Sequence, residues 1–287
     1  MPSLIDFRRR IRSVRNTQQI TKAMKMVSAA KLRRAQERVI AARPYAQAMR
    51  EMLADLAAAA SDSSDSPWLV KRDMKRVDLF LVSSDTGLAG AFNSNLLKAS
   101  QKFFEDHRSE EISLALIGRK GRDFYRRRGA KILADHINVL NRPVYSDAAE
   151  IAREIIRRYR EGETDAVFII NNDFKSMMAQ TLSVRQVLPI QIEKKDDAAA
   201  QSDYIYEQPP VEMLDRLVPR YVEVAVYRAM LETVAAYQAA RMTAMDKASS
   251  NAKEVIDTLT LRMNRVRQAA ITKEIIEVVS GAAAAAE

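Results

Sequence analysis

The stretch AQERVIAARPYAQAMREMLADLAAAA, residues 35–60, repeats a small or apolar side chain at alternating steps of four and three residues. This heptad spacing is typical of a helix whose narrow apolar stripe packs against another helix. The stripe consists of Ala35, Val39, Ala42, Ala46, Met49, Leu53, Leu56 and Ala60. Pro44 lies inside the stretch, but the heptad phase is the same on both sides of it. We therefore predict one helix that is kinked, not ended, at this proline.

A second stripe lies near the other end of the chain, at close to one position per helical turn. Its members are Met245, Ala248, Ala252, Val255, Leu259, Met263, Val266 and Ala270. Glycine, the commonest helix stop, is absent before Gly87 and between Gly162 and Gly281. We predict helices over residues 3–60 and 219–282, about 87 Å and about 96 Å long, the second with Pro219 in its first turn. Because such helices are not stable alone in water, the two are predicted to pack antiparallel as a coiled coil.

The glycine-bearing middle of the chain alternates predicted strands with predicted helices, which indicates a small domain with a largely parallel sheet. The strands are expected at 77–83, 112–117, 165–171 and 181–192, with Pro189 placing the last at an edge, and the helices at 93–104, 119–128 and 148–159. The predicted fold class is α/β: a long antiparallel coiled coil of the N- and C-terminal helices with an inserted Rossmann-like α/β domain. The predicted domains are residues 1–60, 61–210 and 211–287.

Charge is concentrated in the first helix. The formal net charge is +9, and residues 8–38 contain eleven basic side chains and one acid, Glu37. This segment is therefore expected to meet an acidic or phosphate-bearing partner. The chain contains no cysteine and only two histidines, His107 and His136, neither with metal-ligand spacing around it, so we predict no disulfide, no metal and no cofactor. The sequence shows neither a secretory signal nor an apolar run of the roughly 20 residues that cross a bilayer, so we expect use on the cytoplasmic side.

Three further motifs have alternative interpretations. IGRKGR, residues 117–122, has the form of a nucleic-acid-binding GXXG loop, but a strand-to-helix turn explains it better. The glycines at 87 and 90 lack a Walker lysine, so they predict a turn and not a nucleotide cradle. Asp85, Asp165 and Asp173 lie where strands end, with capping and turn roles favoured over catalysis. A coiled-coil nucleic-acid binder and a nucleotide-dependent α/β enzyme remain the competing functions.

Four motifs carry a family resemblance. The chain reads RSVRNTQQITKAMKMV over residues 12–27, AKLR over 30–33, ARMTAMD over 240–246 and NRVRQAAITKEI over 264–275. These resemble, almost residue for residue, the gamma subunits of F-type ATP synthases, and the order of predicted elements matches throughout. One departure is the loop after the first strand, SDTGLAGA, which commonly reads SDRGLCGG in the family. Thr86 and Ala89 thus replace an arginine and a cysteine.

The resemblance implies a non-catalytic rotor shaft that couples proton flow to ATP synthesis. The implied partners are a hexamer of alternating alpha and beta subunits, an epsilon subunit and a membrane ring of c subunits, with no nucleic acid and no direct membrane insertion. The implied location is peripheral, on the cytoplasmic face of a bacterial inner membrane. The implied contacts to beta-subunit loops are Arg8, Arg9, Met24, Lys25, Arg33, Arg34, Arg267, Gln268 and Thr272.

Overall fold

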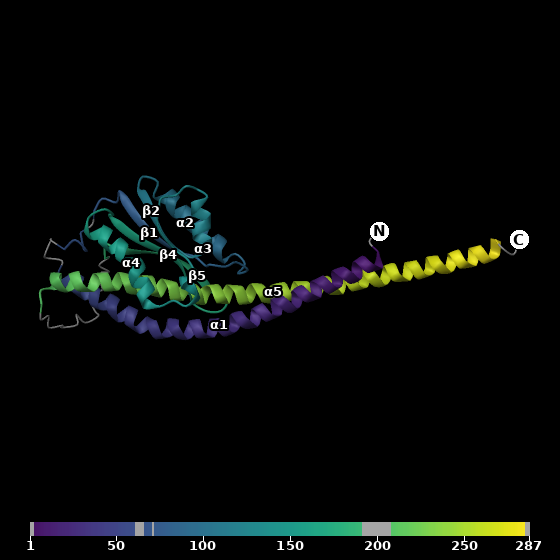
Figure 1. The fold of residues 1–287 in the computed structure, drawn as a ribbon. Coiled ribbons are helices and arrows are strands. Elements are labelled where there is room, and N and C mark those ends of the chain that lie inside the picture. The colour runs from purple at the N-terminus through teal and green to yellow at the C-terminus, as the bar shows by residue number, and fades with distance from the viewer. Residues whose placement is uncertain (1–2, 61–65, 71, 191–207, 285–287) are drawn as a thin grey trace. The chain divides into compact units, whose positions relative to one another are not determined.

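The computed structural model describes residues 3–60, 66–70, 72–190 and 208–284 (Figure 1). The chain divides into a smaller unit, Met1–Ser28 with Met242–Glu287, and a larger unit, Ala29–Arg241. Two long helices, α1 (Leu4–Ala59) and α5 (Pro210–Ala284), contribute to both units. The predicted fold class is confirmed, because the two long helices pack together and the α/β sheet is inserted between them in the sequence.

The larger unit contains a five-stranded sheet in the order β3-β2-β1-β4-β5. Its strands are β1 (Arg76–Val82), β2 (Glu111–Ile117), β3 (Ile132–His136), β4 (Ala166–Phe174) and β5 (Gln180–Leu188). The first four pair in parallel and β5 runs antiparallel to β4, so the largely parallel sheet is confirmed. The connecting helices are α2 (Phe92–Asp106), α3 (Arg119–Arg126), the short 3-10 helix η1 (Val139–Asn141) and α4 (Tyr145–Arg160).

The sheet has an apolar core on each face, because successive side chains of a strand point to opposite sides. Leu79 and Leu81 of β1 pack with side chains of α2 and α3. Phe80 and Val82 lie on the other face and pack with side chains of α1, α4 and α5. The long helices are therefore part of the core of the larger unit, not an attachment to it.

The predicted apolar stripe of the first helix is confirmed as its buried face. Ala42 is half-buried, and the other seven positions from Ala35 to Ala60 are buried. Pro44 lies inside α1 without ending it. Burial of Leu53 and Leu56, at 1% and 0% exposure, explains why the helix continues, because apolar packing of this kind offsets the hydrogen bond that a proline removes.

The predicted start of the C-terminal helix at Pro219 is wrong. The helix α5 begins at Pro210, the first helical position, where a missing N–H leaves no bond unmade. Pro219 lies inside the helix instead. Leu214 and Val218 are fully buried in the core just before it, so packing carries the helix across the proline.

Other differences from the predicted elements are smaller. The strand β3 was not predicted, because its five residues, ILADH, are mixed in polarity and mostly half-buried, without the alternation that marks a strand. The extended segment expected at 181–192 is β5, and Asp173, expected at a strand end, lies within β4. Residues 61–65 of the predicted stop and the loop expected at 194–202 lie outside the described residues.

Trp68 anchors the chain as it leaves α1. The side chain is fully buried and its ring stacks on Tyr159 of α4, with 5.7 Å between the ring centroids. The indole N–H donates to Asp215 Oδ1 of α5 at 2.6 Å. Burial raises the pKa of the Tyr159 hydroxyl to about 12. One side chain thus ties α4 to α5 within the larger unit.

In the smaller unit the heptad positions of α1 continue, but their chemistry changes. Buried and half-buried positions recur at Leu4, Phe7, Ile11, Val14, Gln18, Thr21, Lys25 and Ser28. The opposing face of α5 supplies Met245, Ser249 and Ala252. The second predicted stripe is correct except at Val255, which is 45% exposed while its neighbour Ile256 is half-buried. The α1 side of this seam is therefore apolar from Leu4 to Val14 and polar from Gln18 to Ser28.

Candidate partner-binding surface

The α1 helix starts with two reciprocal hydrogen bonds between Ser3 and Asp6. The backbone N–H of Ser3 donates to Asp6 Oδ2 at 3.0 Å, and the N–H of Asp6 donates to Ser3 Oγ at 3.2 Å. The bond from the Ser3 N–H holds the pKa of the Asp6 carboxyl below its ordinary value. Arg8 and Arg9, one turn further on, are both exposed. They are available to a partner from the first turns of the helix.

Met24 and Lys25 lie in the smaller unit and are both half-buried. Lys25 Nζ lies 2.6 Å from Asp246 Oδ1 of α5, with 41% and 56% of the two side chains exposed. About one turn of α1 away, Thr21 Oγ1 lies 2.7 Å from Ser249 Oγ. Lys25 therefore already has a partner within the chain, and any outside partner would have to share it with Asp246.

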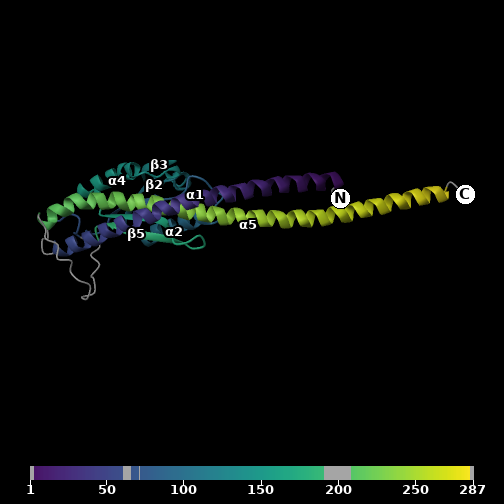
Figure 2. The same cartoon turned by 90° about the horizontal axis from the view of Figure 1, so that it is seen from below.

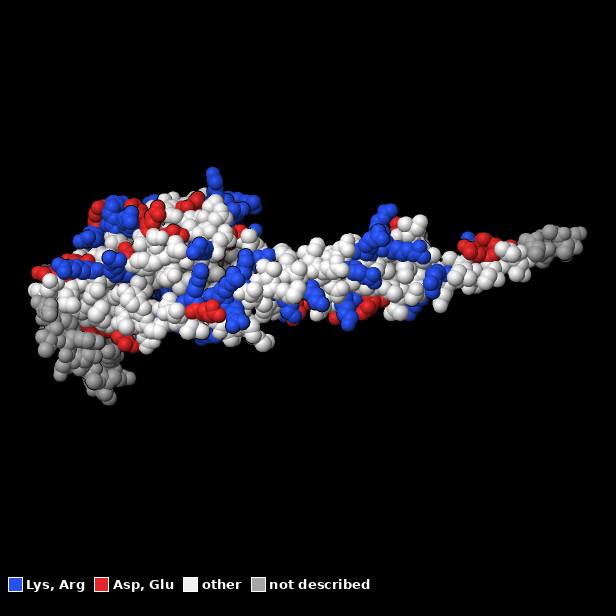
Figure 3. All heavy atoms as spheres, turned by 60° about the horizontal axis from the view of Figure 1, so that its bottom comes forward, with Lys and Arg blue, Asp and Glu red and all other residues white. Residues whose placement is uncertain are grey.

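Arg33 and Arg34 belong to the larger unit and are both exposed. Arg33 Nε lies 3.5 Å from Glu37 Oε1, one helical turn ahead, in a pair whose side chains are 86% and 66% exposed. Arg34 faces a pocket described below. On the face drawn in Figure 3, basic side chains form separate groups with uncharged surface between them.

Arg267, Gln268 and Thr272 lie together near the C-terminal end of α5, and all three are exposed. The Thr272 hydroxyl donates to the Gln268 carbonyl oxygen at 3.0 Å, within the helix. Thr21 lies opposite Ser249, and Lys25 opposite Asp246. Extending this antiparallel register brings Leu4, where α1 begins, opposite about residue 266. Figures 1 and 2 both show α5 continuing past the start of α1.

The structure thus places the nine predicted residues in two units. The smaller unit contains seven of them. Arg267, Gln268 and Thr272 share one segment of α5. The other four lie on α1, where Met24 and Lys25 are neighbours, as are Arg8 and Arg9. Arg33 and Arg34 belong to the larger unit. Sequence reasoning missed two further cations, Arg142 and Arg241, which line the same pocket as Arg34. Arg241 belongs to the motif at residues 240–246, but no local motif could have indicated that it lines one pocket with Arg34 and Arg142, because the three come from distant segments.

The aspartates at strand ends have structural roles. Asp85 Oδ1 accepts from the backbone N–H groups of Arg119 and Asn138, each at 3.0 Å. Asp165 accepts hydrogen bonds from the N–H groups of Lys75 and Arg76. Burial raises the pKa of its carboxyl, but the hydrogen bonds, above all that from the Arg76 N–H, outweigh burial and leave the pKa below its ordinary value. These bonds fit the predicted capping and turn roles.

The candidate GXXG loop is the turn between β2 and α3. Gly118 has a φ of 97°, a conformation that favours glycine, and a Cβ there would lie 2.3 Å from the Ser83 carbonyl oxygen. At Gly121 a Cβ would lie 3.0 Å from Ser83 Oγ, which accepts the Gly121 N–H at 2.8 Å. Both glycines therefore allow α3 to approach β1, as the strand-to-helix interpretation requires.

Within the described residues, no group of three or more His, Cys, Asp or Glu side chains is placed to hold a metal ion. Among the described helices, none is long and apolar enough to cross a membrane. In the loop after β1, the Thr86 hydroxyl lies 2.5 Å from the Tyr237 hydroxyl of α5. Thr86 thus links the loop to the long helix at the position where the family resemblance leads one to expect arginine.

Two long helices that pack together, with an α/β sheet inserted between them in the sequence, define a helical-hairpin protein with an inserted sheet domain. A family model described as ATP synthase matches residues 3–285. The chain is 56% identical to the ATP synthase gamma chain of Solibacter usitatus, over 99% of this chain and 100% of that one. It is 49% identical to that of Geobacter metallireducens, over 98% of each. The chain belongs to the ATP synthase gamma-chain family.

Solved structures agree. The central stalk and c-ring structure of the Tetrahymena thermophila mitochondrial ATP synthase contains a chain similar to this one at a TM-score of 0.60 and 25% identity, covering 80% of this chain and 99% of that one. A chain of the Euglena gracilis mitochondrial enzyme has the same fold, with a TM-score of 0.70 over 98% of this chain and 94% of that one, at 18% identity. The subunit is a central-stalk rotor of an F-type ATP synthase and is itself non-catalytic.

Proposed function

We propose that this subunit carries torque from a membrane ring of c subunits to the catalytic sites of a hexamer of alternating alpha and beta subunits. Proton flow turns the ring, and the chain turns with it while it binds an epsilon subunit. At each angle the long helices present different side chains to each beta subunit. Such differential contact shifts each site among its empty, ADP-loaded and ATP-loaded states. On this proposal the subunit lies peripherally on the cytoplasmic face of a bacterial inner membrane.

The observation that carries this proposal is the exposure of Arg267, Gln268 and Thr272 on α5. These positions lie at 0°, about 100° and about 140° around a helix of 3.6 residues per turn. They fall within one arc, so a single loop of a beta subunit can reach all three. Arginine supplies a fork of donors, glutamine a donor and an acceptor, and threonine a hydroxyl oxygen that still accepts. This set suits the carboxylate and backbone groups of a loop.

The basic side chains of α1 supply a second contact. Arg8, Arg9, Arg33 and Arg34 are exposed, and the weak pair between Arg33 and Glu37 leaves the guanidinium largely solvated. We propose that these side chains, with Met24 and Lys25, meet acidic loops of beta subunits as the shaft turns. Attraction between several exposed charges acts over roughly 10 Å at 0.1 M salt, so this contact is expected to weaken at higher ionic strength.

The test at the C-terminal end is Arg267→Ala in the assembled enzyme, reconstituted into vesicles. We expect ATP synthesis to fall several-fold, because a contact made at some rotor angles is lost while folding is unaffected. The matched control is Arg262→Ala, which removes an exposed arginine that lies about 140° from Arg267 in the direction opposite to Thr272, outside the arc. The circular-dichroism melting curve of the subunit should match that of the unchanged chain in both variants. Equal losses of synthesis in the two variants would falsify the proposed contact.

The test of the basic segment reverses the charges of Arg8, Arg9, Arg33 and Arg34 to glutamate. ATP-driven proton pumping in vesicles should fall at least several-fold at low salt, and the difference from the unchanged enzyme should shrink at high salt. Assembly with alpha and beta subunits is measured in parallel by co-purification. Normal assembly together with normal pumping in the quadruple variant would show that these cations are only solvated.

A further inference from the structure

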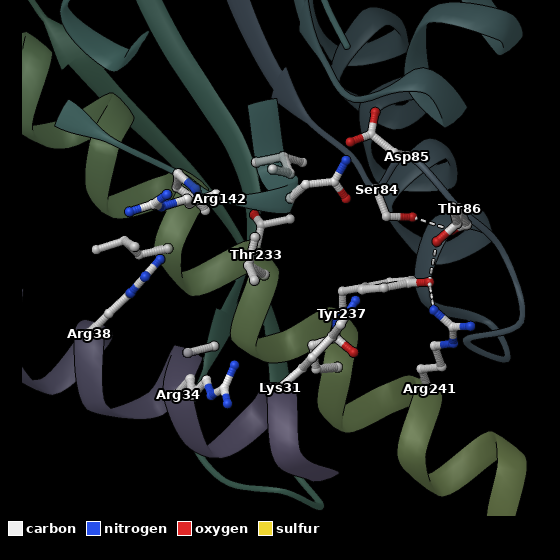
Figure 4. A pocket seen from close by; sticks show the side chains of 17 residues that line it. Lys31, Arg34, Arg38, Ser84, Asp85, Thr86, Arg142, Thr233, Tyr237 and Arg241 are labelled. Carbon is white, nitrogen blue, oxygen red and sulfur yellow. Dashed lines mark hydrogen bonds between the residues drawn. The ribbon is translucent and has the colours of Figure 1, made fainter. Parts of the chain in front are cut away.

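The larger unit contains a pocket of about 470 Å³, and among its described lining residues Arg34 alone also belongs to the proposed rotary contact. It lies between α1, α5, the loop after β1 and the segment that joins η1 to α4 (Figure 4). A volume of this size is within the range of small-molecule binding sites. All of its lining residues belong to the larger unit, so its geometry is that of one compact body.

The pocket is strongly cationic. Three of its basic side chains lie on one face of α1, at positions i, i+3 and i+7, and two others come from the segment after η1 and from α5. These are Lys31, Arg34, Arg38, Arg142 and Arg241. Within the described residues none of the five forms an ion pair. Figure 4 shows Lys31 and Arg34 rising from α1 towards α5, with Arg38 and Arg142 on one side and Arg241 on the other.

The carboxylate of Asp85, the one acidic side chain among the described lining residues, does not neutralise these cations. Its Oδ1 atom is held by the backbone N–H groups of Arg119 and Asn138. Figure 4 shows Asp85 at the edge of the pocket, on the side away from α1. The lining therefore carries five positive charges against the one negative charge of Asp85, whose Oδ2 atom is buried without a hydrogen-bond partner, and this excess favours an anion with several charges.

Buried polar atoms in the same lining lack partners. Thr233 is fully buried and Gln238 is 8% exposed, yet Thr233 Oγ1 and Gln238 Oε1 form no hydrogen bond, and neither does Arg241 Nε. A buried polar group without a partner costs free energy, so these atoms point to a ligand that supplies one. Thr233 and Arg241 are donors suited to phosphate oxygens. The amide oxygen of Gln238 suits a hydroxyl, as on a sugar or a protonated phosphate.

We propose that this pocket binds a polyphosphate, either free or as the phosphate chain of a nucleotide. Cations that come from three separate segments match a chain of charged groups better than a single small anion. Leu231, Leu140 and Tyr237 line the remaining wall and give an apolar surface on which a base can lie. We expect the site to bind its ligand without hydrolysing it, because the described lining residues include no histidine and their one carboxylate, Asp85, accepts hydrogen bonds from backbone N–H groups.

The experiment is isothermal titration calorimetry on the full chain with sodium triphosphate as the probe. We expect saturable binding at one site per chain, weakened at least tenfold by Arg34→Gln and by Arg142→Gln. The matched control is Arg33→Gln, which removes the same charge from the neighbouring position outside the pocket and should change the dissociation constant less than twofold. Equal weakening by Arg33→Gln and Arg34→Gln would overturn the proposal, because the binding would then be general attraction to a basic helix.

A variant that changes no charge separates specific binding in the pocket from general electrostatic attraction to its cations. Thr233→Val keeps the size of the side chain and removes only the unpartnered hydroxyl, so the fold should persist, as the melting curve checks, while triphosphate binds about threefold more weakly. Unchanged affinity in this variant would also count against the site. Titrations with ATP and AMP identify the source of the phosphate chain. If ATP binds more tightly than triphosphate, the ligand is a nucleotide; if ATP and triphosphate bind with equal affinity, the site recognises the phosphate chain alone. Pocket-dependent binding of a glutamate-rich peptide without triphosphate binding would replace the polyphosphate with an acidic protein segment.

Discussion

The α1 and α5 helices meet in both units, but by different chemistry. In the larger unit, side chains such as Leu56 and Val222 are fully buried, and the same cluster includes residues of the sheet and α4. In the smaller unit, Thr21 faces Ser249, and Lys25 pairs with Asp246 at a surface that stays half-exposed. The same heptad spacing therefore supports a sheet-backed core in one unit and, around Thr21 and Lys25, a shallow polar contact in the other. We infer that spacing specifies the pairing and that side-chain chemistry sets its strength.

The largest effect that tests this comparison is expected from Leu56→Ala. Leu56 is fully buried in the main core, so its truncation should lower the free energy of unfolding by about 3 kcal/mol. Urea unfolding followed by fluorescence of Trp68, the single tryptophan, reports on the larger unit. Val14→Ala, at a half-buried position of the smaller unit, should leave the Trp68 transition unchanged. The comparison fails if both variants shift that transition equally.

An intermediate effect is expected when the polar part of the contact between α1 and α5 in the smaller unit is made apolar with Thr21→Val and Ser249→Ala together. Replacing both partners of the hydroxyl pair leaves no group unsatisfied, and the added apolar contact should stabilise the helix pairing by about 1 kcal/mol. Amide hydrogen exchange over residues 14–28 should slow by a factor of about 5. Thr17→Val, at an exposed position of the same helix, is the control and should change nothing. Faster exchange in the double variant would contradict the interpretation of the seam.

The smallest effect is expected at the ion pair between Lys25 and Asp246. Because 41% and 56% of these side chains are exposed, solvent screens the pair despite its 2.6 Å separation. A double-mutant cycle with Lys25→Met and Asp246→Asn should give a coupling of no more than about 0.5 kcal/mol. The coupling should vanish in about 1 M salt, where the screening length is roughly 3 Å. A coupling of several times that size would place this pair among the main supports of the smaller unit.

The fold was largely predictable because its signals are local. The heptad positions from Ala35 to Ala60 predicted the buried face of α1, and apolar runs predicted β1, β2 and β4. The errors arose where tertiary packing overrides local preference. Pro219 looks like a helix start, but burial of Val218 and Leu214 carries the helix across it.

The candidate site was less accessible to prediction. Arg267 and Gln268 belong to a motif that could be read along the chain, and the structure places them on an exposed helix segment. Arg142, Thr233 and Arg241 could not be found in this way, because they meet Arg34 only after the sheet has brought distant segments together. The assignment of Val255 to the apolar stripe was also wrong, because Ile256 is half-buried in its place. A repeat of about one apolar residue per turn does not decide between two adjacent apolar residues.

The last described turns of α5 expose aliphatic side chains, and this affects how the cell must produce the subunit. Ile271, Ile275, Ile276, Val278 and Val279 are between 48% and 71% exposed, on a segment of helix beyond the start of α1. A newly made chain would present this aliphatic surface to every other protein around it, and such surfaces aggregate. The subunit is therefore best synthesised in step with the partners that receive it, and free copies should aggregate more readily than assembled ones.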